Sequence, residues 1–315
     1  MNLCMHCRKP ITQDENHWHT ACIKKFFGIS ELPILAIDTS ELERYARTAI
    51  NAGLTVPGVQ KKLSLHLDRT QGRERLTLIG YPPGFIAKLQ TEEYAHLPEL
   101  EDATMHMADA ASIQTVPHAL IPLHDGSLAY ISKRIDRVII KKQMCKLPME
   151  DFCQLSSRLT EDKYKGSYEQ CGKLINTYSS QNMLDITNFW YLLVFCFITG
   201  NSDMHLKNFS LYAPDGRHYQ LTPAYDLLPA TLVLPDDKEE TALSLGGKHS
   251  RLNRRDFLQL AQHLNLSPKV GERLIHRLLA LEDVFIEIVS ASHLTEEEKQ
   301  AFKALIQSRI RRLQA

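Results

Sequence analysis

The hydrophobic pattern of this chain changes near residue 150, and the change limits the folds available to it. Before that point, short alternating or apolar runs separated by turn residues cover 63–68, 75–79, 84–90, 118–123 and 128–135, with one helical stretch at 98–112. We expect the five short runs to be strands, and the first three of them to form a meander. Afterwards the periodicity is helical over 185–198, 255–265, 268–289 and 295–313. This order predicts an α+β fold with two lobes and a functional site near their junction.

The composition excludes several classes of protein. The 315 residues suffice for about two domains. Lys+Arg and Asp+Glu are both 37, so the chain has no net charge to attract nucleic acid or an anionic membrane. The longest apolar run, 189–199, is about half the ~20 residues of a membrane span, and the N-terminus has no signal pattern. We therefore expect a cytoplasmic protein without a membrane segment and without direct nucleic-acid binding.

Residues 1–28 are dense in cysteine and histidine and are predicted to form a small module of their own. A Cys-x2-Cys pair is followed by a His-x2-Cys pair, a spacing that suits a closed tetrahedral zinc site. The predicted ligands are Cys4, Cys7, His19 and Cys22. His17 and His6 are rival imidazoles for the fourth position, and reduced thiols without a metal are the alternative.

A cluster of polar residues, 200–210, directly follows the apolar helix. Asp203 and Asn208 have the spacing of a kinase catalytic loop, where the Asp orients the substrate hydroxyl and the Asn holds a metal ion. Asp226, between apolar neighbours further on, is a natural second ligand for Mg²⁺. An isolated Asp-x4-Asn match would more often be a capping turn, so the interpretation depends on further motifs in the expected order.

The sheet-rich half supplies two such motifs. Residues 53–62 contain two glycines and a proline ahead of an alternating strand, so their backbone N–H groups are candidates to wrap phosphates. Lys88 lies in the apolar run 85–89, where a cation needs an anionic partner, and Glu101 on the following helix is predicted to pair with it. The alternative is that Lys88 is an edge-strand residue that aids solubility.

Six motifs in order, residues 55–62, 86–89, 136–137, 150–154, 201–210 and 221–226, resemble those of the HipA-like serine/threonine kinase toxins of bacterial toxin–antitoxin systems. The resemblance covers about residues 50–310. It implies a two-lobed protein-kinase-like fold of the HipA and PI3-kinase type, with a zinc module at 1–28, an N-lobe at 29–135 and a C-lobe at 136–315. The phosphate loop lies close to the start of the chain, as in the short HipT type, which lacks the N-terminal subdomain of HipA.

The resemblance also implies roles for individual residues. Asp203, Lys88 and His205 are the expected catalytic group, Asn208 and Asp226 the Mg²⁺ ligands, and Thr55 the autophosphorylation site in place of the family's serine. Pro57 replaces a second hydroxyl of the short type. The implied ATP contacts are Val56, Gly58, Val59, Gln60, Lys61, Lys62, Lys88, Lys133, Ile135, His205, Asn208 and Asp226.

The same resemblance implies ATP and Mg²⁺ as cofactors, an aminoacyl-tRNA synthetase as substrate, inhibition of translation, and antitoxins of the HipB and HipS types as partners. Two alternatives stay open. One is a nucleotide-binding pseudokinase that acts as an antitoxin-bound interaction module, and the other is a small-molecule kinase with similarly spaced acidic and amide residues.

Overall fold

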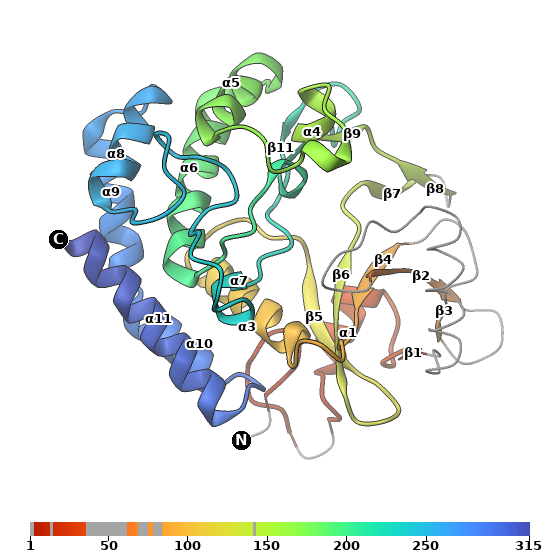
Figure 1. The fold of residues 1–315 in the computed structure, drawn as a ribbon. Coiled ribbons are helices and arrows are strands. Elements are labelled where there is room, and N and C mark those ends of the chain that lie inside the picture. The colour runs from red at the N-terminus through yellow and green to blue at the C-terminus, as the bar shows by residue number, and fades with distance from the viewer. Residues whose placement is uncertain (1–2, 13–14, 36–61, 69–74, 78–83, 141–142) are drawn as a thin grey trace. The chain divides into compact units, whose positions relative to one another are not determined.

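The structure is a computed structural model that describes residues 3–12, 15–35, 62–68, 75–77, 84–140 and 143–315 (Figure 1). The chain divides into two compact units. The first comprises Met1–Asp102 and Val116–Ile135, and the second comprises Ala103–Thr115 and Asp136–Ala315. Helix α3 (Leu97–Ala110) contributes residues to both units, as this division cuts through it.

A six-stranded sheet with the order β1-β3-β2-β4-β6-β5 is the main element of the first unit. Its strands are β1 (Ile34–Leu35), β2 (Lys62–Asp68), β3 (Arg75–Thr77), β4 (Phe85–Lys88), β5 (His118–Pro122) and β6 (Leu128–Lys133). The expected meander is wrong, because β2 lies between β3 and β4. The reason is the length of β2: its residues 66–68 pair with β3 and its residues 62–65 pair with β4.

The segment that carries the first cysteines packs against this sheet. It includes helix α1 (Thr20–Phe27), which ends at Gly28 in the left-handed conformation, φ 73°. The Trp18 indole is buried and donates to the carbonyl of Leu120 on the edge strand β5, at 3.0 Å. At the end of α1, the Phe26 ring stacks on Phe85 of β4, and the Phe27 ring packs against Phe85 at a tilt of 42°. The segment therefore shares the hydrophobic core of the first unit.

Helix α6 (Asn182–Thr199) forms the core of the second unit, as the apolar run predicts. Among the described residues it is the helix that is long and apolar enough to cross a membrane, yet 72% of it is buried inside the structure, as in the core helix of a globular unit. The other helices of this unit are α4 (Phe152–Leu155), α5 (Tyr168–Tyr178), α7 (Ala230–Val233), α8 (Arg254–His263), α9 (Pro268–Leu279), α10 (Glu282–Ser290) and α11 (Glu296–Gln314), with 3-10 turns η1 (Thr160–Asp162) and η2 (Leu206–Asn208). The single helix expected over 268–289 is wrong, because α9 and α10 are separate helices.

A small antiparallel sheet positions the polar loop of the second unit. Its order is β11-β10-β9, with β9 (Met149–Asp151), β10 (Ser210–Tyr212) and β11 (Gln220–Leu221). A separate hairpin pairs β7 (Arg137–Ile140) with β8 (Gln143–Lys146). The first residue of β10, Ser210, is the register partner of Asp151 at the end of β9, and β11 ends on the other side of β10. Three segments therefore meet at the same end of this sheet: the end of β9, the loop before β10 and the segment after β11.

Candidate active site

The loop begins where the buried helix α6 stops. Gly200 ends the helix with φ 73°, and the backbone N–H of Asn201 donates to the carbonyl of Cys196 at 2.9 Å, an arrangement typical of a helix C-terminus. A Cβ on Gly200 would lie 2.5 Å from Leu305 Cδ2. The glycine therefore permits both the left-handed turn and the close packing that direct the chain out of the core.

Backbone contacts hold Asp203 and Asn208 in one compact turn. The carbonyl oxygen of Asp203 accepts hydrogen bonds from the His205 backbone N–H at 2.9 Å and from Asn208 Nδ2 at 3.1 Å. The Asp203 side chain is exposed, whereas Asn208 is 8% exposed. Because the amide nitrogen of Asn208 is engaged in the turn, its Oδ1 is the atom that remains for a cation, and an amide oxygen suits Mg²⁺.

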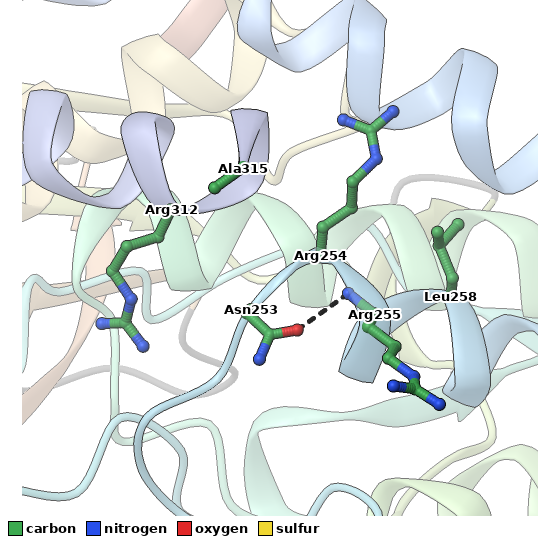
Figure 2. Close-up of a pocket in the computed structure, with 6 residues that line it drawn as sticks. All are labelled: Asn253, Arg254, Arg255, Leu258, Arg312 and Ala315. Atoms are coloured by element: carbon green, nitrogen blue, oxygen red, sulfur yellow. Dashed lines mark hydrogen bonds between the residues drawn. The ribbon is translucent and has the colours of Figure 1, made fainter.

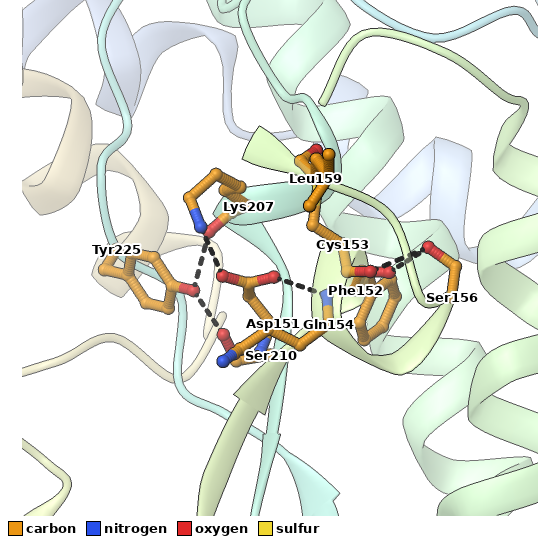
Figure 3. Close-up of polar contacts among 9 residues, drawn as sticks. All are labelled: Asp151, Phe152, Cys153, Gln154, Ser156, Leu159, Lys207, Ser210 and Tyr225. Carbon is orange, nitrogen blue, oxygen red and sulfur yellow. Dashed lines mark hydrogen bonds and ion pairs between the residues drawn. The ribbon is translucent and has the colours of Figure 1, made fainter. Parts of the chain in front are cut away.

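Asp226 follows a segment that is tied to the same loop. Its φ of 62° lies in the left-handed region, which is uncommon for residues other than glycine and is often found at functional sites. The hydroxyl of Tyr225 donates to the carbonyl of Lys207 at 3.2 Å and lies 2.7 Å from Ser210 Oγ (Figure 3). Burial raises the pKa of this phenol, so it stays protonated. These bonds fix the backbone next to the Asp226 carboxylate.

The loop is also fastened to the end of β9. Lys207 Nζ lies 2.6 Å from Asp151 Oδ2, and the other oxygen of Asp151 accepts the Gln154 backbone N–H at the start of α4 (Figure 3). In return, the Gln154 side-chain oxygen accepts the backbone N–H of Asp151 at 2.9 Å, which completes a capping box. One carboxylate therefore caps α4 and anchors the polar loop.

His205 is buried beside these groups, with 7% of its surface exposed. Burial lowers its pKa, and the charge of Lys163 lowers it further, while the carboxylates of Asp203 and Asp226 act in the opposite direction. The net effect favours the neutral imidazole. Its Nδ1 is buried and has no hydrogen-bond partner among the residues that the structure describes, and its role as a nucleotide contact remains a prediction.

In the first unit, the expected pair of Lys88 and Glu101 is confirmed. Lys88 Nζ lies 2.5 Å from Glu101 Oε1, and both side chains are almost completely buried. The ammonium group also lies 5.4 Å from the centre of the Tyr130 ring. The alternative of an exposed edge-strand lysine is thus wrong, because β4 is an inner strand. A role for Lys88 at phosphates stays a prediction.

The other predicted nucleotide contacts of this unit are only partly described. Lys62 is exposed at the start of β2 and is the register partner of Lys88. Lys133 ends β6, and its Nζ lies 3.5 Å from the carbonyl of Lys25 and 5.4 Å from the centre of the Phe26 ring. Ile135 is half-buried. The remaining predicted contacts lie outside the described residues, namely Thr55, Val56, Gly58, Val59, Gln60 and Lys61.

The predicted metal ligands of the N-terminal segment converge on one point. The ligand atoms of Cys4, Cys7, His19 and Cys22 all lie within 4.8 Å of one another. His19 Nδ1 is 3.3 Å from Cys7 Sγ and 3.7 Å from Cys22 Sγ, close to the ~3.6 Å between N and S ligands of tetrahedral zinc. His19 Nε2 bonds the carbonyl of Pro10 at 2.9 Å, which directs Nδ1 toward the thiols.

The two rival imidazoles lie elsewhere. His6 stacks on Trp18 and its Nδ1 is 3.0 Å from the carbonyl of His118. His17 is not part of the Cys/His cluster. Burial raises the pKa of the Cys4 thiol, but the backbone N–H groups of His19, Cys7 and His6 outweigh this, so that its pKa is lowered. Three thiols and one imidazole fit a zinc ion.

A separate pocket is lined by Asn253, Arg254, Arg255, Leu258, Arg312 and Ala315 (Figure 2). Two of its three arginines are paired with carboxylates: Arg254 pairs with Glu272, and Arg312 lies 2.6 Å from Glu240. None of the predicted site residues lines it. The Arg254 guanidinium also donates to the carbonyl of Leu313 on α11 at 2.8 Å, so this side chain helps to pack α8 against α11.

Four residues that shape the polar loop were not predicted from the sequence to be functional, namely Tyr164, Asp151, Lys207 and Tyr225. Tyr164 donates to Asp203 Oδ1 at 2.9 Å across 39 positions of sequence. A contact of that sequence separation has no local signal. Lys207 and Tyr225 lie beside Asn208 and Asp226 in the chain, so their proximity to the site was the available signal.

Comparisons with known proteins agree with this arrangement. The family model described as HipA-like C-terminal domain matches residues 54–285. "Putative kinase Y4dM" of Sinorhizobium fredii is 32% identical over 233 residues, which is 69% of this chain and 55% of the relative, so the chain spans about half of that protein's length. A "Putative kinase" of Haemophilus influenzae is 22% identical over 268 residues, 78% of this chain and 77% of the relative.

Two solved structures share the fold. The first is from a complex of HipA, HipB and operator DNA of Shewanella oneidensis, with a TM-score of 0.71, 18% identity, and coverage of 91% of this chain and 73% of the other. The second is the Helicobacter pylori proinflammatory kinase CtkA, with a TM-score of 0.53, 13% identity, and coverage of 81% and 94%. The predicted α+β architecture is confirmed as a mixed α/β, kinase-like fold. Because the family model covers most of the chain, this chain belongs to the family of HipA-like C-terminal domains.

Proposed function

We propose that the chain is an ATP- and Mg²⁺-dependent serine/threonine protein kinase. The observation that carries this proposal is the polar loop, in which Asp203 presents an exposed carboxylate while its own backbone carbonyl holds the amide of Asn208. A kinase needs a carboxylate beside the acceptor hydroxyl and oxygen ligands for metal ions. The loop supplies the first, and Asn208 Oδ1 with the Asp226 carboxylate suits the second.

The residues would divide the work of phosphoryl transfer as follows. Asp203 orients the acceptor hydroxyl and takes its proton as the oxygen attacks the γ-phosphorus and the bond to the β-phosphate oxygen breaks. Lys88, held by Glu101, neutralises phosphate charge. Mg²⁺, bound through Asn208 and Asp226, would supply further positive charge at the phosphate oxygens. Neutral, buried His205 contacts the nucleotide without adding charge.

We further propose that the kinase is the toxin of a toxin–antitoxin system. The support is the family match and the similarity to HipA in a complex with HipB and operator DNA. The proposed substrate is an aminoacyl-tRNA synthetase, whose phosphorylation would inhibit translation, and the proposed partners are antitoxins of the HipB and HipS types. Autophosphorylation at Thr55 would add a charge of about −1.5 to −2 to the phosphate loop and quench activity.

We also propose that the Cys/His cluster holds a structural zinc ion. A site closed by three thiolates and one imidazole would fix the N-terminal segment against β5. The contacts of Trp18 and His6 with β5 and of Phe26 with Phe85 would then depend on the metal. Zinc content of the purified protein by plasma mass spectrometry should be close to one per chain and should fall in Cys22→Ser. A metal-free protein with unchanged thermal stability would contradict the site.

The test of the kinase proposal is transfer of labelled γ-phosphate from Mg·ATP to protein, with and without a cell extract, followed by mass spectrometry. We expect phosphoserine or phosphothreonine, with Thr55 among the labelled sites, and transfer about 10²–10⁴-fold slower with Asp203→Ala. ATP binding without transfer to any protein would favour the pseudokinase alternative, and label confined to small molecules would favour the small-molecule kinase.

A further inference from the structure

The carboxylate of Asp203 has a partner that the proposed kinase chemistry does not by itself require. The hydroxyl of Tyr164 donates to Asp203 Oδ1 at 2.9 Å. The other oxygen, Oδ2, has no donor among the described residues, and the residue is exposed to solvent. One oxygen is therefore held by the protein, and the other is left available to an acceptor hydroxyl.

The ring of Tyr164 is fixed as well as its hydroxyl. It contacts the buried imidazole of His205 edge-on, with 5.1 Å between the ring centres and an angle of 79°. Lys163 Nζ lies 4.9 Å from the centre of the Tyr164 ring. Burial and the neighbouring Asp203 carboxylate raise the pKa of the phenol. Tyr164 is therefore a neutral hydrogen-bond donor, although 48% of its surface is exposed.

The backbone around Tyr164 is tied to the polar loop on both sides. The carbonyl of Lys163 accepts the Leu206 N–H at 3.1 Å. On the other side, the buried hydroxyl of Tyr168 donates to the carbonyl of Met204 at 3.2 Å. The carbonyl of Lys165, between them, accepts a bond from Arg158. Residues 163–168 are thus attached to the polar loop at both ends, and these bonds hold the Tyr164 phenol beside the Asp203 carboxylate.

We propose that Tyr164 is a positioning residue, which holds the Asp203 carboxylate in the rotamer that directs Oδ2 at the acceptor hydroxyl. The inference rests on the proposed kinase function. An exposed aspartate samples several rotamers, and only one of them places an oxygen in line with the hydroxyl that attacks phosphorus. The bond from Tyr164 selects that rotamer before the substrate binds.

The test is Tyr164→Phe, which removes the hydroxyl and keeps the ring against His205. The matched control is Tyr178→Phe, since Tyr178 is also 48% exposed but lies on α5 and has no contact with Asp203. We expect kcat for phosphate transfer from Mg·ATP to fall about ten- to hundredfold, as for loss of a hydrogen bond to a charged group. The KM for ATP should stay within about twofold, and the control should match the wild type in both parameters.

A second comparison separates positioning from structural support. In an Asp203→Ala background there is no carboxylate to orient, so Tyr164→Phe should cause no further fall in the residual rate. An equal fall in both backgrounds, or an unchanged kcat in the single variant, would overturn the proposal while leaving the kinase assignment intact. A wild-type protein that transfers no phosphate to any acceptor would overturn both, and the wild-type arm alone reveals that outcome.

Discussion

The buried pair of Lys88 and Glu101 allows a quantitative prediction. The side chains are 5% and 1% exposed, with 2.5 Å between Nζ and Oε1. At an effective dielectric constant of about 20, the attraction of two unit charges at that distance is about 7 kcal/mol, which offsets the cost of burying them. Glu101→Gln removes one charge and leaves the ammonium buried. We expect a loss of about 3–5 kcal/mol in the free energy of unfolding.

The assay is urea or thermal unfolding of wild type, Glu101→Gln, Lys88→Met and the double variant Lys88→Met with Glu101→Leu. Each single variant should unfold about 6–12 °C earlier for a loss of about 3 kcal/mol. The double variant should return to within about 1 kcal/mol of the wild type, because an apolar pair of similar volume has no charge to desolvate. Two single variants that each cost less than about 1 kcal/mol would refute the reasoning, since the pair would then be hydrated.

Two more predictions concern the second unit. Gly200→Ala should lower the free energy of unfolding by about 2 kcal/mol, because a left-handed alanine is strained and its Cβ would displace Leu305. The control Gly216→Ala, with φ 78° and open space around the Cβ, should lower it by about 1 kcal/mol. Equal losses for the two variants in urea unfolding would contradict the packing argument. Burial raises the pKa of Glu240, but Arg312, the Leu252 N–H and Arg309 outweigh it, so the pKa is lowered. The stability that this carboxylate adds is thus present above its ordinary pKa near 4.5 and is lost as the pH falls through the lower value of the folded state. Glu240→Gln should lower the free energy of unfolding by about 2 kcal/mol at pH 7 and by progressively less in acid. A loss that does not change with pH in urea unfolding would contradict a lowered pKa of Glu240.

Short-range patterns predicted much of this protein. The core helix α6 follows from its apolar run. The cluster of three cysteines with His19 follows from the spacing of its two pairs, because two residues three positions apart have few ways to place their side chains, and both pairs suit one metal ion. The pairing of Lys88 with Glu101 follows from the cost of an unpaired buried charge. These features depend on neighbours in the chain or on a simple energetic rule.

Features that depend on distant pairing could not be predicted. Alternation shows that residues 62–68 form a strand, but not that its two halves pair with different partners. The break between α9 and α10 has no glycine or proline to mark it, and Leu281 at the start of α10 provides no side-chain cap. The bond from Tyr164 to Asp203 exists only because two loops meet in the folded unit.

The proposed role of Asp203 as the base of phosphoryl transfer from ATP is tested most directly by the rate of that transfer by Asp203→Asn. We predict a kcat about 10²–10⁴-fold below the wild type, as for loss of a general base. The affinity for Mg·ATP should be unchanged, because Asp203 is not among the proposed metal ligands. An Asp203→Asn protein that transfers phosphate at the wild-type rate would contradict this role.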